Sequence, residues 1–426
     1  MPKLIEIRCP IYGFIDLDEW EQEIIYQPAF QRLRRIRQLA WTDYVYPGAM
    51  HTRFEHSLGV MHMATMLYDG VVSRGWGYLQ SELGYDEAGR HRYRKLVRLA
   101  ALLHDVGHGP FSHAVEDLAP TKGGTPDSEH FCHEEYSAAI IGRHFKDVIE
   151  NHKANNNYGF SVDDIQGLVE GGSAAGRASL WQELISGQLD ADRMDYLLRD
   201  AYHAGVEYGR YDWRRIVNTV EVVPDVESGA LRLGVSDGGR HAAEGLIIAR
   251  YMMFSQVYFH KTRVILDFHL HEAVKNMLPE QQFPEPVADH LDEYLKWDDW
   301  RVLGELAAGN GGEHGCRLVR RNCYRQVWET PEFPSSEDDE RLAKAETMLE
   351  ELQPVRREAG KSWYKLGEAD LPVSAAHPDD KTKPLSMCST IVGNMKPSRC
   401  TRLFVKPEYR ARARGILKAN RKGNGQ

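Results

Sequence analysis

The sequence predicts a mainly α-helical protein, and two observations support this fold class. Apolar residues recur at helical spacing near the N-terminus, at Phe30, Leu33 and Ile36, with arginines on the opposite face. Several later segments are also expected to be helices, whereas only residues 220–237 have the pattern of a β-hairpin, with a Glu-Ser-Gly turn. A helical core with a small β component follows from this balance.

The expected elements follow one another along the chain. Residues 1–20 are expected to be extended and to end in a short turn, and residues 21–40 to form a helix that Pro28 breaks or restarts. Gly107 and Gly109-Pro110 end the helix that precedes them. The other expected helices are 54–74, 93–105, 186–204 and 240–275; the expected loops are 120–130, 151–160, a glycine-rich 305–316 and an acidic 334–340; and the chain is locally basic from Lys396 onward.

Composition excludes several classes of protein. A chain of 426 residues has room for two or three domains, and its net charge of −9 argues against general attraction to nucleic acid or membranes. The six cysteines show no CxxC spacing, so a disulfide framework or a zinc knuckle is not expected. The N-terminus lacks the pattern of a signal peptide, and no apolar stretch is long enough to span a bilayer. We therefore expect a cytoplasmic protein.

Two histidines and two aspartates in three separate segments carry the chemistry. His56 lies in HTRFEHSLGV, His104 and Asp105 in LLHDVGHGPFSH, and Asp192 in LDADRMDYLLRD. Two imidazoles and two carboxylates form a mixed nitrogen and oxygen set that suits a divalent hydrolytic metal. An adjacent His-Asp pair after a long apolar run is costly to bury unless something binds it.

Helical spacing gathers further polar residues on two faces. Asp192, Tyr196 and Asp200 follow one another at intervals of four, while Asp195 and Arg199 are expected to form a separate structural ion pair. A second stripe joins Arg250, Phe254, Tyr258 and Lys261, and it suits an elongated polyanion. An ordinary solvated helix face would also produce this stripe.

The ordered series of motifs resembles a known family. HTRFEHSLGV, LLHDVGHGPFSH, FCHEEYS and DADRMDYLLRD are similar to motifs of the HD-domain metallophosphohydrolases, and most similar to their deoxynucleoside triphosphate triphosphohydrolase branch. The resemblance runs from about Cys9 to about Lys261, with a weaker echo in RLFVKPEYR. It implies a helical HD-domain core at 1–280, with motifs at 51–204 and a phosphate-binding helix at 240–275, then a mixed α/β region at 281–426 with a basic flexible tail at about 410–426.

The resemblance also implies roles for individual residues. The implied metal ligands are His56, His104, Asp105 and Asp192; the implied substrate contacts are Gln38, Arg53, Arg193, Tyr196, Asp200, Arg250, Tyr258 and Lys261; and His108, His113 and His133 match a second histidine cluster. The metal would be one divalent ion (Mn, Fe, Ni, Zn or Mg), with an additional Mg carried by the triphosphate. The expected substrate is a dNTP, and the expected products are a deoxynucleoside and intact triphosphate.

The chemistry is consistent with these residue types. A metal can polarise a phosphoryl oxygen and lower the pKa of bound water, and arginines can neutralise the charge that develops on the phosphate. Histidine side chains in general titrate near neutral pH, so His113 is a candidate general acid for the leaving 5′-oxygen. Glu116 lies three residues further along and could orient it.

One departure concerns regulation. Relatives that guanine nucleotide activates carry an Asp where this chain has Tyr26, although Gln31 and Arg34 are retained. A regulatory phosphate site at Gln31 and Arg34 is therefore expected without guanine selectivity, in a homo-oligomer of two or four chains.

Two other functions are compatible with these residues. An HD phosphodiesterase acting on a cyclic or signalling nucleotide would use a second metal, with His108 and His133 as direct ligands. A non-catalytic nucleotide sensor or defence-system subunit would use the fold for binding alone, and it would have no need of the full ligand set.

Overall fold

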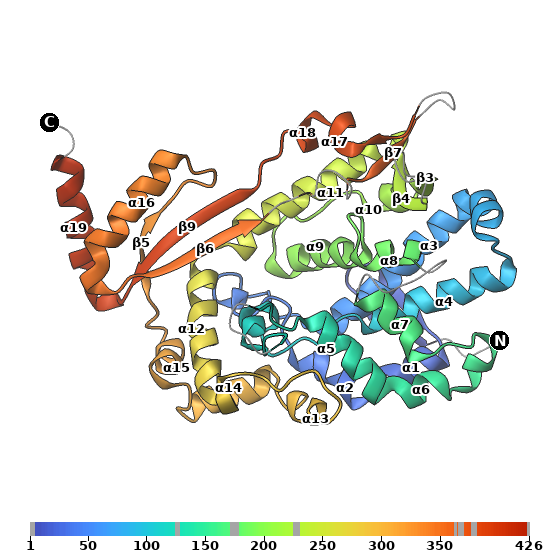
Figure 1. The fold of residues 1–426 in the computed structure, drawn as a ribbon, viewed down its shortest axis with the longest axis horizontal. Helices are drawn as coiled ribbons and strands as arrows, with labels where there is room; N and C mark the ends of the chain where they lie inside the picture. Colours follow the sequence, from blue (N-terminus) through green and yellow to red (C-terminus); the bar gives the residue numbers. More distant parts are fainter. Residues whose placement is uncertain are drawn as a thin grey trace.

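The computed structural model describes residues 5–123, 128–170, 179–224, 231–361, 364, 370–375 and 381–423. A helical body forms most of the molecule, and a smaller part that combines helices and strands extends from one side of it (Figure 1). The prediction of a mainly α-helical fold with a small β component is confirmed. Among the described residues, no helix is long and apolar enough to cross a membrane.

The N-terminal segment forms a hairpin followed by short helices. Strands β1 (Ile5–Cys9) and β2 (Gly13–Leu17) pair antiparallel, which agrees with the expected extended segment. The predicted helix at 21–40 is only partly right, because the chain forms α1 (Glu19–Ile25), α2 (Pro28–Gln31) and the 3-10 helix η1 (Arg32–Arg35), and then becomes extended. Pro28 begins α2, as its fixed φ and missing N–H favour at the first helical position.

Two long helices form the centre of the body. Helices α3 (Arg53–Leu83) and α4 (Glu87–Leu103) pack against each other, and α9 (Ala191–Ala204) packs against α3. The apolar end of α4, with Leu99 to Leu103 fully buried, explains why this helix lies at the core. These packing contacts bring the three sequence motifs, which lie at the ends of α3, α4 and α9, into one place.

Shorter helices surround this centre. They are η2 (Thr42–Tyr44), η3 (Ser112–Leu118), α5 (His133–Ile140), η4 (Ile141–Phe145), α6 (Lys146–Glu150), η5 (Lys153–Asn157), α7 (Val162–Val169), α8 (Ser179–Ser186), α10 (Trp213–Val217) and η7 (Asp237–Gly239).

The predicted helix at 240–275 is interrupted. Helix α11 (Arg240–Met253) continues into the π-helix η8 (Phe254–Tyr258), and α12 (Lys261–Met277) starts anew after Phe259 and His260. His260 caps α12 through its Nδ1 atom, which accepts a hydrogen bond from the Thr262 N–H at 3.3 Å. A π-helix has an extra residue per turn, and a break in the helix follows it. Residues 240–275 therefore do not form the single helical face that the spacing predicted.

Within the described ranges, three small sheets complete the fold. The predicted hairpin is confirmed as β3 (Val220–Pro224) and β4 (Leu231–Ser236), which pair antiparallel; its Glu-Ser-Gly turn lies outside the described residues. Strands β7 (Pro372–Ser374) and β8 (Lys383–Pro384) extend this sheet in the order β3-β4-β7-β8. The third sheet has the order β5-β9-β6, formed by β5 (Arg325–Glu329), β9 (Ser398–Val405) and β6 (Val355–Lys361).

Three predicted loops or tails are helical instead. The glycine-rich segment 305–316 contains the end of α14 (Asp299–Ala307) and most of α15 (Gly312–Val319). The acidic segment 334–340 begins α16 (Ser336–Leu349), because Ser335 caps it and acidic residues in the first turn complement the helix dipole. The tail predicted to be flexible forms α19 (Arg410–Gly423), since Ala413 and Leu417 are buried in an apolar cluster.

The remaining short C-terminal elements are η9 (Pro279–Gln281), α13 (Leu291–Tyr294), η10 (Glu350–Leu352), α17 (Leu385–Cys388), α18 (Thr390–Gly393) and η12 (Pro407–Tyr409).

In the part of the chain that the structure describes, the apolar core divides into one large and two small clusters. The large cluster runs through the body and includes residues on both sides of residue 280, such as Leu270, Tyr294 and Leu318. A separate small cluster joins α16, β9 and α19. The division of the chain at residue 280 stays a prediction.

Candidate active site

Four predicted metal ligands lie close together where α3, α4 and α9 meet. Nitrogen and oxygen atoms of His56, His104 and Asp192 all lie within 4.8 Å of one another. Asp105 completes the group, because its carboxylate oxygens are 3.3 Å from His104 Nε2 and 3.5 Å from His56 Nε2. The long separation of these residues in sequence makes the convergence a result of tertiary packing.

Hydrogen bonds direct the Nε2 lone pairs of both histidines toward the carboxylates. Nδ1 of His104 donates to the Ala101 carbonyl at 2.8 Å, so its buried Nε2 is left as an acceptor without a hydrogen-bond partner. Nδ1 of His56 lies 2.8 Å from Asp195 Oδ2, while its Nε2 lies 3.0 Å from Asp192 Oδ1. Acceptor atoms that face one another need a cation between them, so these residues fit a divalent metal.

The electrostatics of the group support the same conclusion. Burial alone would lower the pKa of His56, but its contacts with Asp192 and Asp195 outweigh burial and raise that pKa to about 10. Burial raises the pKa of Asp105, but Arg53 outweighs it and holds the pKa well below the usual range. The carboxylates are therefore charged and demand positive charge, which a metal ion would supply.

Asp195 supports the metal site from behind. It accepts hydrogen bonds from Arg199 Nε and Nη2, each at 2.8 Å, and the expected ion pair between them is confirmed. Tyr12 also donates its hydroxyl to Asp195 Oδ1 at 2.9 Å. The sequence reasoning missed the contacts of Asp195 with His56 and Tyr12, and no local pattern signals them, since Tyr12 lies 183 residues away from Asp195.

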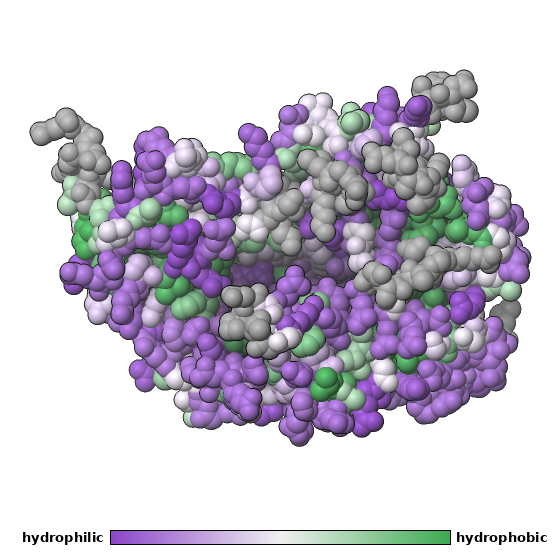
Figure 2. All heavy atoms as spheres, in the orientation of Figure 1, coloured by the Kyte–Doolittle hydropathy of each residue, from purple (hydrophilic) through white to green (hydrophobic). Residues whose placement is uncertain are grey.

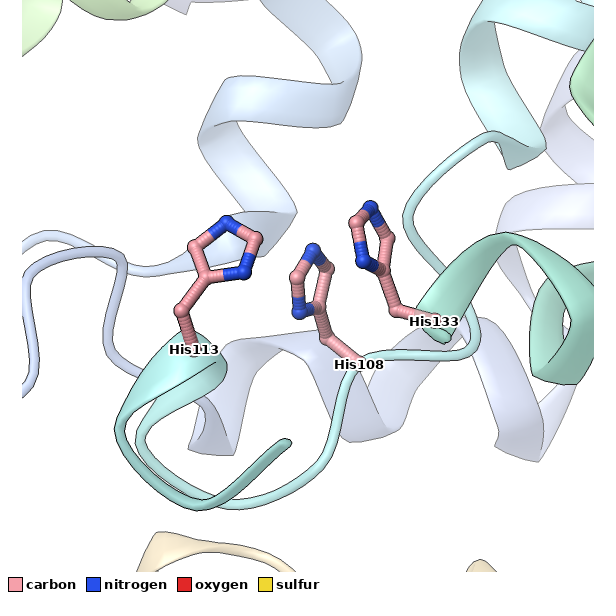
Figure 3. Close-up of side chains that lie close together, drawn as sticks. All are labelled: His108, His113 and His133. Atoms are coloured by element: carbon pink, nitrogen blue, oxygen red, sulfur yellow. The ribbon is translucent and has the colours of Figure 1, made fainter. Parts of the chain in front are cut away.

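His108, His113 and His133 form a second histidine cluster (Figure 3). It lies beside the first group, because His108 Nε2 is 3.3 Å from Asp105 Oδ1. The rings of His108 and His133 are stacked with centroids 3.8 Å apart, and the ring of His113 lies nearly perpendicular to both. Glu116 joins two of them, with one oxygen 2.7 Å from His113 Nδ1 and the other 2.5 Å from His133 Nδ1. Burial raises the pKa of Glu116, but these two contacts outweigh it and lower the pKa far below its usual range.

An unusual turn positions His113. Phe111 and Ser112, immediately before it, have positive φ angles of 56° and 58°, a region that side chains other than glycine rarely adopt. Asp299 accepts a hydrogen bond from the Phe111 N–H at 2.7 Å and another from the Arg37 N–H at 2.8 Å. Ser112 donates to the Arg37 carbonyl at 2.8 Å. Contacts from distant parts of the chain therefore hold a strained backbone, as is common at functional sites.

The aspartate at the far end of the α9 stripe binds two donors. One oxygen of Asp200 lies 2.7 Å from His51 Nε2, and the other accepts a hydrogen bond from the Tyr258 hydroxyl at 2.5 Å. The sequence reasoning missed His51, which is buried and stacks on His203 with centroids 4.4 Å apart. Since the Nδ1 of His51 has no hydrogen-bond partner, the proton belongs on Nε2. His51 therefore donates to Asp200.

These groups open into one cavity of about 700 Å³. Figure 2 shows a hollow near the middle of the same face as Figure 1, bordered mostly by hydrophilic residues. The predicted residues that line the cavity are Gln38, Arg53, His104, Asp105, His108, His113, His133, Asp192, Arg193, Tyr196, Asp200 and Tyr258. His56 and Glu116 contact these residues from behind them.

Two predicted phosphate contacts lie outside the cavity lining. Lys261 lines a different cavity of about 430 Å³, because the break after Tyr258 starts a new helix at Lys261. Arg250 is partly buried, and its charge acts on Tyr196 and Arg193. Two cations that the sequence reasoning did not select, Arg263 and Arg357, do line the active-site cavity.

The predicted regulatory residues are adjacent. Arg34 Nε donates to Gln31 Oε1 at 2.9 Å, and the Arg34 guanidinium lies 3.4 Å from the ring centroid of Phe54. Tyr26 is exposed on the same N-terminal segment. These residues do not line the active-site cavity.

Comparison with known proteins shows that the region containing the four predicted metal ligands matches a known family. Residues 53–200 match the HD domain family, and residues 211–353 match a family described as the HD associated region. A crystal structure of a hypothetical protein from Aquifex aeolicus has a TM-score of 0.79 and 28% identity, over 97% of this chain and 100% of that chain.

Relatives with curated descriptions extend the comparison. An uncharacterized protein of Methanocaldococcus jannaschii is 37% identical over 75% of this chain and 59% of its own length. The uncharacterized protein YwfO of Bacillus subtilis is 31% identical over 92% of this chain and 90% of its own length. Human deoxynucleoside triphosphate triphosphohydrolase SAMHD1 is 31% identical over 63% of this chain and 44% of its own length. The chain thus belongs to the HD-domain superfamily of phosphohydrolases, in its deoxynucleoside triphosphate triphosphohydrolase-like branch.

Proposed function

We propose that the protein is a metal-dependent dNTP triphosphohydrolase that converts a dNTP and water to a deoxynucleoside and triphosphate. One observation carries the proposal: the metal-ligand group, the His113–Glu116 pair and the Asp200–Tyr258 pair all meet at one cavity of about 700 Å³. That volume is in the range of sites for small molecules. The relative SAMHD1, whose name states this activity, supports the choice of substrate.

His56, His104, Asp105 and Asp192 would hold the metal. A bound divalent ion would polarise a phosphoryl oxygen and lower the pKa of the attacking water. Asp195 would fix the orientation of the His56 ring through the 2.8 Å contact at Nδ1, and the Ala101 carbonyl would do the same for His104.

His113 would donate a proton to the leaving 5′-oxygen. Its Nδ1 contacts Glu116, which leaves Nε2 to face the substrate, and the side chain is 57% exposed in the cavity wall. Glu116 would stabilise the protonated imidazole because it is a half-buried carboxylate whose pKa is strongly lowered, so that it stays charged.

Arginines would bind the phosphates and an aspartate would bind the sugar. Arg53 and Arg193 line the cavity, and Arg250 would support them from outside its lining. Lys261 lines a separate cavity of about 430 Å³, so it is not assigned to this phosphate group. Asp200 would accept a hydrogen bond from the sugar 3′-hydroxyl, with Tyr196 packed beside the deoxyribose.

Product identification tests the proposal. Purified protein would be incubated with each dNTP and Mn²⁺ or Mg²⁺, and the products separated by chromatography. We expect a deoxynucleoside and intact triphosphate. Orthophosphate or pyrophosphate as the sole inorganic product would contradict the proposal, and the absence of any hydrolysis would favour a non-catalytic nucleotide sensor.

A phosphodiesterase with two metals is the second candidate. The observation that favours it is the close approach of nitrogen atoms of His108, His113 and His133, all within 4.8 Å of one another. Metal analysis distinguishes the two functions, because the triphosphohydrolase needs one tightly bound ion per chain and the phosphodiesterase needs two. A second tightly bound equivalent, lost in His133→Ala, would favour the phosphodiesterase.

Homo-oligomerisation and a regulatory phosphate site complete the proposal. The contact between Gln31 and Arg34, beside exposed Tyr26, supports binding of a phosphate group without guanine selectivity. We expect light scattering to report a dimer or tetramer, and we expect dATP hydrolysis to respond similarly to GTP and ATP. Activation by guanine nucleotides alone would contradict the inferred effect of Tyr26.

A further inference from the structure

One wall of the active-site cavity contains three charged residues that the proposed reaction does not use. Arg263 and Asp267 lie on α12, and Arg357 lies on the neighbouring strand β6. All three line the active-site cavity and also an adjoining cavity of about 410 Å³. The three residues therefore form a wall between two solvent-accessible spaces.

Polar atoms in this wall lack partners. Arg263 Nε lies 3.4 Å from Asp267 Oδ2, yet Arg263 Nε and the other aspartate oxygen, Oδ1, are buried without a hydrogen-bond partner. The two side chains are 14% and 20% exposed. A buried polar atom without a partner costs free energy, so the hydrogen-bonding capacity of this pair is incompletely satisfied where the two residues line the cavity.

The wall lies next to the residues proposed to bind the sugar. The guanidinium of Arg263 lies 5.6 Å from the ring centroid of Tyr258, whose hydroxyl donates to Asp200. Apolar Phe259 and Val264 line the cavity beside it. A base attached to a sugar at Asp200 would therefore reach this wall, with apolar surface available to its ring.

We propose that Arg263, Asp267 and Arg357 form a base-recognition site that selects guanine. This inference rests on the proposed function, since it assigns the base of the same dNTP. Guanine offers two adjacent N–H donors, N1 and N2, which match a carboxylate acceptor. It also offers two adjacent acceptors, O6 and N7, which match the forked donors of an arginine. Adenine, thymine and cytosine all lack this pair of adjacent N–H donors.

Substitution of the carboxylate tests the assignment. The kcat/KM of triphosphate release would be measured for all four dNTPs with the wild type, Asp267→Asn and Arg357→Gln. We expect the wild type to prefer dGTP. Asp267→Asn should reduce kcat/KM for dGTP by about 10- to 100-fold relative to dATP, the range for one lost bidentate contact. Arg357→Gln should also lower the preference for dGTP.

A matched control separates recognition from the loss of a surface charge. Asp69→Asn removes another carboxylate that pairs with an arginine, Arg94, at 2.8 Å on an exposed helix face away from the cavity. This variant should retain the base preference of the wild type. Thermal melting of each variant would check that it is folded.

The outcomes for the base site and for the reaction are distinguishable. Equal loss of activity with all four dNTPs in Asp267→Asn, or no change in preference, would overturn the base site while leaving the reaction intact. If no dNTP is hydrolysed, calorimetric binding of deoxyguanosine and deoxyadenosine to the wild type and Asp267→Asn still decides the inference. Tighter binding of deoxyguanosine that depends on Asp267 would support it, and equal binding of both nucleosides would overturn it.

Discussion

At the scale of single residues, the site is organised by carboxylates that fix the tautomers of histidines. Asp195 contacts Nδ1 of His56, Glu116 contacts Nδ1 of His113, and Asp200 accepts from Nε2 of His51. In each case the carboxylate fixes which ring nitrogen carries the proton, and for His56 and His113 it leaves Nε2 free to act. The metal-facing and substrate-facing nitrogens of His56 and His113 are both Nε2 for this reason.

The first prediction concerns the proton donor. His113→Ala should lower kcat by about 10²- to 10⁴-fold, the usual range for the loss of general acid catalysis, without changing the metal content. Glu116→Gln should lower kcat less, because the histidine remains while its charged partner is lost. Rates would be measured from triphosphate release, and metal by elemental analysis. A near-normal kcat in His113→Ala would remove this residue from the mechanism.

The second prediction concerns support of the metal ligand. Asp195→Asn should weaken metal affinity by about 10- to 100-fold, because it removes the carboxylate that orients His56. Metal titration with a competing chelator measures the effect. Tyr12→Phe, which removes only one donor to Asp195, should have a smaller effect and serves as a graded control. Unchanged affinity in Asp195→Asn would show that His56 needs no such partner.

At the scale of elements, helix ends and breaks decide where functional side chains lie. His104 ends α4, and the turn that follows carries Phe111 and Ser112 at positive φ before His113. Asp299, the first residue of α14, holds this turn by accepting the Phe111 N–H. A C-terminal helix thus positions the catalytic loop, although none of its residues lines the cavity.

The third prediction follows from this contact. Asp299→Ala should lower kcat by about 10-fold or more, because displacement of a reacting group by about 1 Å is costly, while the metal stays bound. Asp299→Asn keeps one acceptor oxygen and should have an intermediate effect. Steady-state kinetics and metal analysis on folded variants measure this. If Asp299→Ala lost metal as well as activity, the contact would support the whole site rather than the loop.

At the scale of the whole molecule, a buried ionic group joins the N-terminal segment to the core. Glu21 on α1 accepts hydrogen bonds from Lys95 and Arg98 on α4 at 2.6 to 2.7 Å. Burial alone would raise the pKa of Glu21, but these cations outweigh it and lower that pKa to about 2. A carboxyl with a lowered pKa stabilises the fold above its unfolded pKa of 4.5, and this stabilisation is lost as pH falls toward 2.

The fourth prediction is a pH dependence of stability. The free energy of unfolding should fall by up to about 3 kcal/mol on this account as the pH is lowered through the window from 4.5 to 2. Glu21→Gln should lower stability at pH 7 by about 3 kcal/mol, because buried Arg98 loses its carboxylate partner while Lys95 keeps only Asp18. The variant should also lose less stability than the wild type as the pH falls from 4.5 to 2.

Urea unfolding at several pH values measures both effects. Glu19→Gln on the same helix is the control, because the pair it forms with Lys153 is exposed and should contribute little. If the free energy of unfolding of Glu21→Gln falls as steeply between pH 4.5 and 2 as that of the wild type, the pH dependence arises from other carboxyl groups.

Much of the site could be predicted because its chemistry is local in sequence. The His104-Asp105 pair lies within one motif, and Asp192, Tyr196 and Asp200 share one face of α9 as their spacing predicted. Local sequence patterns also sufficed to predict helices α3 and α4, and a strand-turn-strand pattern sufficed to predict the hairpin of β3 and β4. Local patterns failed for segment 334–340 and the basic tail, because a cap and tertiary burial made polar segments helical.

The sequence by itself determined which residue types could bind a metal and donate a proton, because each motif carries its own side chains. Only the tertiary structure decided which of them share a cavity. The π-helix and the break before α12 separate Lys261 from Tyr258 and bring Arg263 to the cavity instead. The contact of Asp299 with Phe111 spans 188 residues. Packing of distant segments selects such partners, and no periodicity within one element records them.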